Sequence, residues 1–409
     1  MPEPQSQFPR RRRIWPIVVA SVAVLSGAAY LPLTLLAPIP EIVAEEKAYD
    51  VPGSDPVTIE FPGYGAAGLG AVGFDGVLAY SGSRVPLPMA SITKVITALV
   101  VLEASPLKPG DSGPSRVLTE QDAAFYEQQI PQDGSREPVP VGTTYSQRTM
   151  LDLMLMASAN NYALSLSSWF FGSDAEFLNA ARGWLDDHGL DDTTVTDPTG
   201  ILPTNTSSVA DLLELAKIAL DDPVISEIVG TALIDVPGIG PIDNSNKLLG
   251  IDGIDGVKTG TLDEAGACLL FSADYSVGGE SITLVGVVLG GPTHAVVNDA
   301  VRALLAQAEA GFREVTVAEE GEQFASYETA WGDEAAAVAA ESASLLVWSD
   351  TPIESSSESS SLRLGEQGLE VGSVEFSSGN RSVSVPLVLD ATIDDPGFWW
   401  RLANPIALL

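Results

Sequence analysis

The chain has 409 residues, with 20 Lys and Arg against 55 Asp and Glu, and its formal net charge is −35. The charges within residues 1–50 cancel, so the rest of the chain carries the whole excess. A surface this acidic repels phosphate backbones, which excludes nucleic acid as a partner. One cysteine, Cys268, and two histidines, His188 and His294, are too few for a thiolate or histidine metal centre, so we expect no metal and no cofactor.

The first 50 residues predict a membrane segment. Four arginines at 10–13 precede an uncharged run over residues 14–37, which as a helix would span ~36 Å and cross a bilayer. The arginines indicate a cytoplasmic N-terminus with the acidic body outside. Small residues at 27–29 leave a cleaved signal peptide as the alternative, while the length of the run favours an uncleaved anchor. Residues 38–56, rich in Pro and Glu, are predicted to be a tether.

Residues 51–312 predict a mixed α+β arrangement. A hairpin around Gly278-Gly279 is preceded and followed by helical patterns, which indicates an antiparallel sheet flanked by helices. The predicted elements are strands over 58–61 and 73–80, helices over 91–104, 120–129, 147–166, 175–188 and 208–220, hairpin strands over 266–273 and 281–289, and a helix over 294–310.

Residues 313–409 predict a small all-β domain followed by a tail. Apolar stretches over 315–317, 344–348, 369–376 and 382–389 read as strands, and residues 355–361 read as a serine-rich loop. Phe398, Trp399 and Trp400 are too few to span a membrane; they pack on the β-domain or lie at the membrane surface.

The first candidate motif is Ser91-Ile92-Thr93-Lys94, at the start of an apolar helix. Residues three apart share a helix face, so the Lys94 amine can reach the Ser91 hydroxyl. Lysine can act as a base for serine when burial or a second cation lowers its pKa. Alone, this pattern is weak, because an exposed capping serine beside a solvated lysine has the same spacing.

Two further motifs carry hydroxyl, amide and amine groups. Ser158 and Asn160 end an apolar helix, where they could relay a proton and orient a substrate carbonyl. Lys258-Thr259-Gly260-Thr261 adjoins a predicted strand, and Gly260 permits close approach of a ligand. The N–H groups of Thr261 and Ser91 could form an oxyanion hole. Each motif alone is more simply a helix terminus or a loop, but their order is the signature of penicillin-binding proteins and class A β-lactamases.

The sequence resembles the serine D-alanyl-D-alanine carboxypeptidases, which are low-molecular-mass penicillin-binding proteins of the peptidase S11 type. The resemblance covers about residues 73–312 and includes PMASITK at 88–94, MLMASANNYAL at 154–164, DPTGILPTNTSSVADL at 197–212 and GVKTGT at 256–261. It implies a penicillin-binding, transpeptidase-like α+β fold with the site at one sheet edge. It also implies removal of the terminal D-Ala from peptidoglycan stem peptides through an acyl-enzyme that β-lactams trap.

The resemblance also assigns roles to the motif residues. Ser91 is expected to be the nucleophile and Lys94 its base, with Ser158 and Asn160 serving proton relay and substrate orientation. Lys258, Thr259, Gly260 and Thr261 are expected to bind substrate. One departure concerns the substrate carboxylate, because well-known members have an arginine where this chain has Val297. His294 and Arg302 are the candidate replacements.

Other functions need residues that this sequence offers only in less suitable places. A class A β-lactamase needs a carboxylate to activate water, and the nearest candidate, Glu176, falls on a predicted helix surface. A Ser-His-Asp hydrolase would need His188 or His294, which read as the end and the first turn of helices, and Cys268 reads as core. An endopeptidase and a catalytically silent surface protein that binds cell-wall peptide remain the alternatives.

Overall fold

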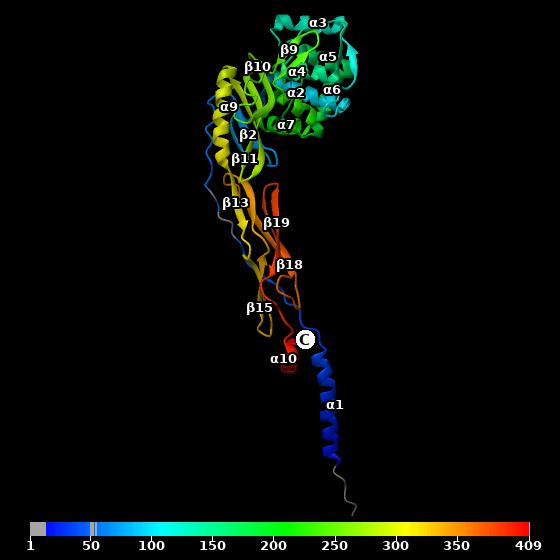
Figure 1. Ribbon diagram of the computed structural model, residues 1–409, viewed down its shortest axis with the longest axis vertical. Helices are drawn as coiled ribbons and strands as arrows, with labels where there is room; N and C mark the ends of the chain where they lie inside the picture. Colours follow the sequence, from blue (N-terminus) through cyan, green and yellow to red (C-terminus); the bar gives the residue numbers. More distant parts are fainter. Residues whose placement is uncertain (1–13, 50–52, 54, 409) are drawn as a thin grey trace, which may run out of the picture.

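The computed structural model describes residues 14–49, 53 and 55–408, and the arginines at 10–13 lie outside the described residues. Figure 1 shows an elongated molecule, with a mixed helix and sheet region at one end and a lone helix at the other. A narrow all-β region joins them. The predicted fold class, α+β followed by an all-β region, is confirmed.

A five-stranded antiparallel sheet organises the mixed region. Its strand order is β10-β11-β12-β2-β3, and β11 and β12 form the predicted hairpin. The helices α7 (Val209–Asp221) and α8 (Pro223–Gly230) pack on one face with the other helices behind them, while α9 (His294–Ala308) covers the opposite face (Figure 1). The strands are β2 (Ala66–Ala71), β3 (Ala79–Gly82), β10 (Ile254–Leu262), β11 (Gly266–Val277) and β12 (Glu280–Gly291).

The helices of this region follow the sequence prediction except that α8 was not predicted and one predicted helix is divided. The stretch predicted as one helix over 147–166 is two helices, because Ser158 adopts a left-handed conformation with φ of 60° and breaks the chain direction. The helices of this region are α2 (Thr93–Ala104), α3 (Glu120–Gln129), α4 (Gln147–Met156), α5 (Asn160–Phe171), α6 (Asp174–Asp187), α7 (Val209–Asp221), α8 (Pro223–Gly230) and α9 (His294–Ala308). Ser208 caps α7 by accepting a hydrogen bond from the N–H of Asp211 at 3.1 Å.

The first strands of the sheet were placed wrongly by the sequence analysis. Residues 58–61 form no strand, and 73–80 mostly connect β2 to β3. The true inner strand, β2, consists of Ala, Gly and Leu, and every one of its residues is buried. Small residues are needed there because a Cβ at Gly68 would lie 2.4 Å from the Val209 Cγ1 of α7.

Short elements connect these parts. They are the strand pairs β4 (Leu87–Pro88) with β7 (Thr206–Ser207), β5 (Ser115–Val117) with β6 (Thr144–Ser146), and β8 (Leu233–Val236) with β9 (Gly240–Asp243). The 3₁₀ turns are η1 (Ala90–Ile92), η2 (Ile130–Gln132), η3 (Glu309–Gly311) and η4 (Pro405–Leu408).

The C-terminal part is a β-domain with its own core, built around Phe324, Tyr327 and Phe376. β13 (Phe312–Ala318) pairs with β16 (Ala343–Trp348), and a second sheet has the order β1-β14-β15-β19-β18-β17. The serine-rich stretch predicted as a loop is the edge strand β17, whose hydroxyl side chains suit a solvent-facing edge. The strands of this sheet are β1 (Glu45–Glu46), β14 (Gln323–Glu328), β15 (Glu334–Ala339), β17 (Glu354–Ser359), β18 (Glu370–Ser378) and β19 (Arg381–Leu389).

The described first part of the segment predicted as a tether, residues 39–47, is in fact part of this β-domain. Glu45 and Glu46 form β1 beside β14, and the N–H of Ile42 donates to the carbonyl of Leu362 at 2.7 Å. Ile39 and Ile42 are buried. The apolar residues among the Pro and Glu of this segment explain the difference, because they enter the β-domain core. The division at residues 50 and 312 stays a prediction.

The N-terminal helix α1 (Trp15–Leu35) is the described helix that is long and apolar enough to cross a membrane. Its side chains are almost all exposed within the molecule, as a lipid-facing helix requires. The C-terminal helix α10 (Gly397–Ala403), which contains Phe398, Trp399 and Trp400, lies beside the end of α1 (Figure 1).

Candidate functional site

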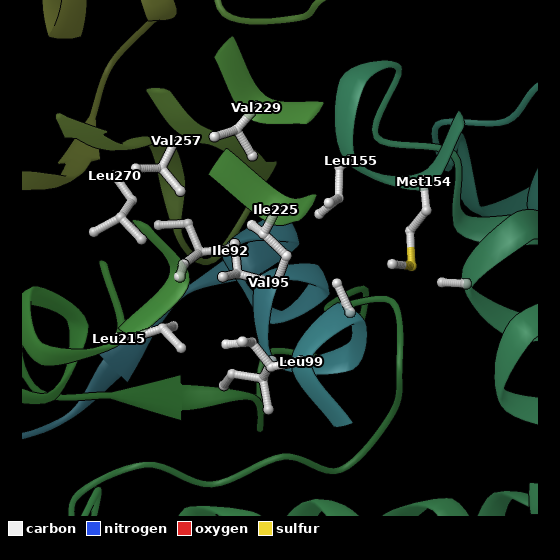
Figure 2. Close-up of a cluster of buried hydrophobic side chains, with 14 of the residues drawn as sticks. Ile92, Val95, Leu99, Met154, Leu155, Leu215, Ile225, Val229, Val257 and Leu270 are labelled. Carbon is white, nitrogen blue, oxygen red and sulfur yellow. The ribbon is translucent and has the colours of Figure 1, made fainter. Parts of the chain in front are cut away.

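The candidate nucleophile, Ser91, lies in a turn that is supported by a buried helix. Ser91 lies within η1, directly before α2, and the side chains of α2 from Thr93 to Leu102 are all buried. Figure 2 shows Ile92, Val95 and Leu99 packed in an apolar cluster with side chains from the helical region and the sheet. Ala90, just before Ser91, has a φ of 48°, which few residues other than glycine adopt. The turn that presents Ser91 is therefore held in shape by the core beneath it.

Lys94 contacts Ser91 as the three-residue spacing predicts. Its Nζ lies 2.8 Å from the Ser91 Oγ and donates to the carbonyl of Thr199 at 2.6 Å. The side chain is completely buried, and no carboxylate forms an ion pair with it among the described residues. Burial lowers the pKa of Lys94 well below its usual value, and the charge of Lys258 adds to this, while Asp197 opposes it. The geometry therefore pairs a hydroxyl with an amine whose neutral form is favoured by burial.

A loop from Asp197 to Leu202 positions the carbonyl that Lys94 contacts. The Asp197 carboxylate accepts hydrogen bonds from the backbone N–H groups of Thr199 at 2.7 Å, Gly200 at 2.9 Å and Leu202 at 3.0 Å. This pattern is a side-chain-stabilised turn. Sequence reasoning did not single out this loop as part of the site, although the Asp-Pro-Thr-Gly string is a turn signal.

The second motif lies at the junction of α4 and α5. Ser158 is the left-handed residue between the two helices, and Asn160 begins α5. Asn160 Nδ2 donates to the Gln129 Oε1 at 2.9 Å, and its backbone N–H donates to the carbonyl of Ser135 at 2.8 Å. Gln129 is 2% exposed, and nothing in the local sequence distinguished it.

The third motif lies on β10, at the edge of the sheet beside η1. A Cβ added at Gly260 would lie 3.2 Å from the backbone nitrogen of Ser91 and 3.1 Å from the Cβ of Ala90. The absence of a side chain is therefore what lets β10 approach the nucleophile. Lys258 is 1% exposed, burial lowers its pKa to about 7, and its Nζ donates to the carbonyl of Thr259 at 3.0 Å.

Contacts with neighbouring segments join the first motif to the third, and join the third motif to the helix end that precedes Ser158. Gly260 adjoins Ser91 as described above. Ser245 links the second motif to the third, because its backbone N–H donates to the carbonyl of Met156, two residues before Ser158, and its Oγ lies 2.7 Å from the Thr259 Oγ1. Ser245 was not among the predicted site residues.

The residues considered as replacements for a carboxylate-binding arginine lie in three different environments. Val297 is completely buried and packs near Gly291. Arg302 forms an ion pair with Asp252 at 2.6 Å. His294 alone of the three contacts a motif residue, with its Nε2 2.6 Å from the Thr261 Oγ1.

The other residues considered for competing functions lie in ordinary structural environments, although Cys268 pairs across the sheet with Gly260. Glu176 is exposed in the first turn of α6, as predicted. His188 is exposed, and its Nδ1 lies 2.7 Å from the carbonyl of Trp184. Cys268 is buried, and burial raises the pKa of its thiol to about 11. Among the described residues no group of acidic, His and Cys side chains could hold a metal ion.

Comparison with known proteins shows which family this chain is similar to. The family model described as D-alanyl-D-alanine carboxypeptidase (peptidase S11) matches residues 75–293, more than half of the chain. The chain is 29% identical over 226 residues to the D-alanyl-D-alanine carboxypeptidase DacF of Bacillus subtilis, covering 53% of this chain and 54% of that protein. It is 30% identical over 191 residues to a D-alanyl-D-alanine endopeptidase of Escherichia coli, covering 45% and 58%.

The chain therefore spans a little over half the length of these curated relatives. Among solved structures, the fold is similar to that of a peptidoglycan synthesis regulatory factor (PBP3) from Streptococcus pneumoniae. The TM-score is 0.61 at 23% identity, and the match covers 82% of this chain and all of that one.

Proposed function

Since the chain belongs to the D-alanyl-D-alanine carboxypeptidase family, we propose that it removes the terminal D-Ala of peptidoglycan stem peptides through an acyl-enzyme on Ser91. The observation that carries this proposal is the buried Lys94 amine, which lies 2.8 Å from the Ser91 hydroxyl. Burial and the neighbouring cation favour a neutral amine, which is the form able to take the serine proton.

The proposed reaction has two stages. Lys94 takes the Ser91 proton while the Oγ attacks the carbonyl of the penultimate D-Ala, and the C–N bond to the last D-Ala breaks as its nitrogen receives a proton. Water then hydrolyses the ester and returns the proton to Ser91. The N–H groups of Ser91 and Thr261 are the proposed donors to the oxyanion, and the close approach of β10 at Gly260 supports this.

The remaining motif residues have supporting roles in this proposal. Ser158 relays the proton to the leaving nitrogen, and Asn160, fixed by Gln129, orients the substrate carbonyl. Lys258, Thr259 and Thr261 contact the substrate carboxylate. A buried lysine with a pKa of about 7 is partly charged at neutral pH, which suits an anionic ligand in an acidic protein.

β-Lactams are expected to acylate Ser91, because they present a reactive carbonyl beside a carboxylate. Rapid release is not expected, since Glu176, the candidate for activating a water, lies exposed in the first turn of α6. The acyl-enzyme should therefore persist.

A fluorescent penicillin tests the nucleophile. The wild-type protein should be labelled covalently, and Ser91→Ala should not. Ser83→Ala, which removes a half-buried hydroxyl that is bonded to the backbone of Val85, is the matched control and should be labelled like the wild type. Absence of Ser91-dependent labelling would overturn the enzyme proposal and favour a silent peptide-binding protein.

The reaction itself is tested by D-Ala release from a peptide ending in D-Ala-D-Ala. An endopeptidase is the second candidate, because one relative at 30% identity carries that name. A protein that binds penicillin and cleaves cross-linked dimers, but releases no free D-Ala from the linear peptide, would be an endopeptidase.

The proposed location is the cell membrane, with α1 kept as an anchor and the rest of the chain outside the cell. Support comes from the length of the apolar helix α1 and from contacts that hold its C-terminal end against the C-terminal segment. Tyr30 donates its hydroxyl hydrogen to the carbonyl of Leu402 at 2.7 Å, and Arg401 donates to the carbonyl of Ala37 at 2.8 Å. Fractionation followed by mass analysis of the N-terminus distinguishes an anchor from a secreted form.

A further inference from the structure

The two threonines of β10 present a pair of hydroxyls with partners from outside the strand. Thr259 and Thr261 flank Gly260, and alternate residues of a strand point to the same face. The Thr259 Oγ1 lies 2.7 Å from the Ser245 Oγ, and the Thr261 Oγ1 lies 2.6 Å from the His294 Nε2. Each threonine has a single O–H, so its outside partner decides whether that hydrogen is available to a ligand.

The position of His294 next to Thr261 is fixed by the start of helix α9. It is the first residue of α9, which is capped by Thr293 through a hydrogen bond from the N–H of Val296 to the Thr293 Oγ1 at 3.3 Å. The ring is half-buried, and Thr261 is exposed. A half-buried ring beside an exposed hydroxyl can change its protonation state while the hydroxyl meets a ligand.

The charged surroundings of His294 bias its protonation. Lys258 lies on β10, Asp263 and Glu264 lie in the turn after β10, and Asp299 lies on α9. Among these described charged groups, Lys258 is the one that shifts the pKa of His294. Burial first, and then the charge of Lys258, lower the pKa of His294 below its usual 6.5.

The direction of the hydrogen bond follows from this protonation state. A neutral ring whose Nε2 lacks hydrogen takes the Thr261 O–H as donor and leaves only lone pairs toward a ligand. A protonated ring donates to the Thr261 oxygen, which frees the O–H to donate elsewhere and adds a positive charge.

We propose that His294 determines specificity by turning the Thr261 hydroxyl toward the carboxylate at the end of the substrate. This inference rests on the proposed function, because that function supplies the carboxylate. It makes His294 a positioning residue that acts through Thr261, and it sets a preference for anionic over neutral substrate ends. The preference is strongest in mildly acidic solution and declines as His294 loses its proton.

The first test compares a charged with a neutral acylating agent. Penicillin and its methyl ester differ in the carboxylate, so the ratio of their acylation rates at Ser91 measures carboxylate preference. At mildly acidic pH, His294→Gln should lower this ratio about tenfold relative to the wild type. The ratio in the variant should also vary less with pH. The pH dependence that remains should come from the titration of Lys258. His188→Gln, which replaces the only other histidine, should match the wild type.

An unchanged ratio and an unchanged pH slope in His294→Gln would overturn the proposal. A loss of acylation with both agents, in equal proportion, would do the same, because it would mean a general structural role. Melting curves of the two histidine variants verify that both are folded.

The second test does not depend on turnover. The pKa values of His294 and His188 can be followed by NMR in Ser91→Ala protein, with His188 as the internal reference. Adding a peptide that ends in D-Ala-D-Ala should raise the pKa of His294 alone, and the matching peptide amide should leave it unchanged. A bound acid peptide that does not move His294 overturns this inference. If neither penicillin nor peptide engages the wild-type protein, the proposed function fails first, and His294 loses its proposed substrate with it.

Discussion

At the residue scale, the site combines two buried lysines that the rest of the molecule does not neutralise. Lys94 and Lys258 are both essentially inaccessible to solvent, and neither forms an ion pair among the described residues. Burying an unpaired cation destabilises the folded state, and the group responds by losing its proton. The site therefore retains its chemistry at the expense of stability.

This cost is measurable with Lys258→Met. The folded pKa of about 7 lies below the usual 10.5, so the unfolded chain binds the proton more tightly and stability rises with pH between these values. Methionine removes the penalty. The variant should be more stable than the wild type by about 1–4 kcal/mol below pH 7, and this gain should disappear toward about pH 10.5.

Urea unfolding at both ends of this pH range tests the expectation. Lys108→Met, which replaces an exposed lysine, should be nearly neutral at either pH. A Lys258→Met protein that is less stable than the wild type at low pH would mean that Lys258 makes a net favourable contribution to folding. The same variant should bind a substrate carboxylate poorly.

At the element scale, the loop from Asp197 to Leu202 connects the fold to the reactivity of Lys94. Gly200 has a φ of 79°, and a Cβ there would lie 2.0 Å from the carbonyl oxygen of Ala90. Gly200→Ala should therefore displace the loop from η1 and move the Thr199 carbonyl away from the Lys94 amine. We expect penicillin acylation to fall at least tenfold, together with a loss of stability of about 1–3 kcal/mol.

Gly189→Ala is the control that distinguishes the effect of backbone strain from the effect of the contact between Gly200 and Ala90. Gly189 also has a positive φ, of 66°, but a Cβ there would meet nothing within 4 Å. This variant should lose similar backbone stability while keeping its acylation rate. Equal rates in the two variants would show that the contact between the loop and Ala90 does not support the site.

The elements also show what the sequence could and could not predict. Most of the helices and the central hairpin were predicted because their apolar periodicity is strong, and Ser91 and Lys94 meet because their spacing is local. The strand β2 was missed because alanine and glycine give no such pattern, although burial on both faces requires them.

The partners of the motif residues could not be predicted for a different reason. Thr199 lies 105 positions from Lys94, Gln129 lies 31 from Asn160, and His294 lies 33 from Thr261. Contacts of this separation depend on how the helices and the sheet pack, and no local pattern marks the residues that make them.

At the scale of the whole molecule, the β-domain lies between α1 and the mixed region that holds the motifs (Figure 1). The two regions meet through side chains, because Arg381 pairs with Glu280 at 2.6 Å and the Trp348 Nε1 donates to the carbonyl of Leu78 at 3.1 Å. With α1 in a membrane, this arrangement carries the site away from the bilayer. The net charge of −35 also disfavours contact of the body with an anionic surface.

The segment between α1 and the sheet then has a structural role that truncation can test. A protein lacking residues 1–37 should leave the membrane fraction and keep its penicillin acylation rate, because α1 is exposed and contributes little to the cores. A protein lacking residues 1–47 also loses Ile39, Ile42 and the strand β1. Burial of the two isoleucines alone accounts for ~3–6 kcal/mol, so calorimetry should show a lower melting temperature for the β-domain of the shorter protein. If the two truncated proteins melt alike, residues 38–47 are only a tether and their pairing with β14 adds nothing to stability.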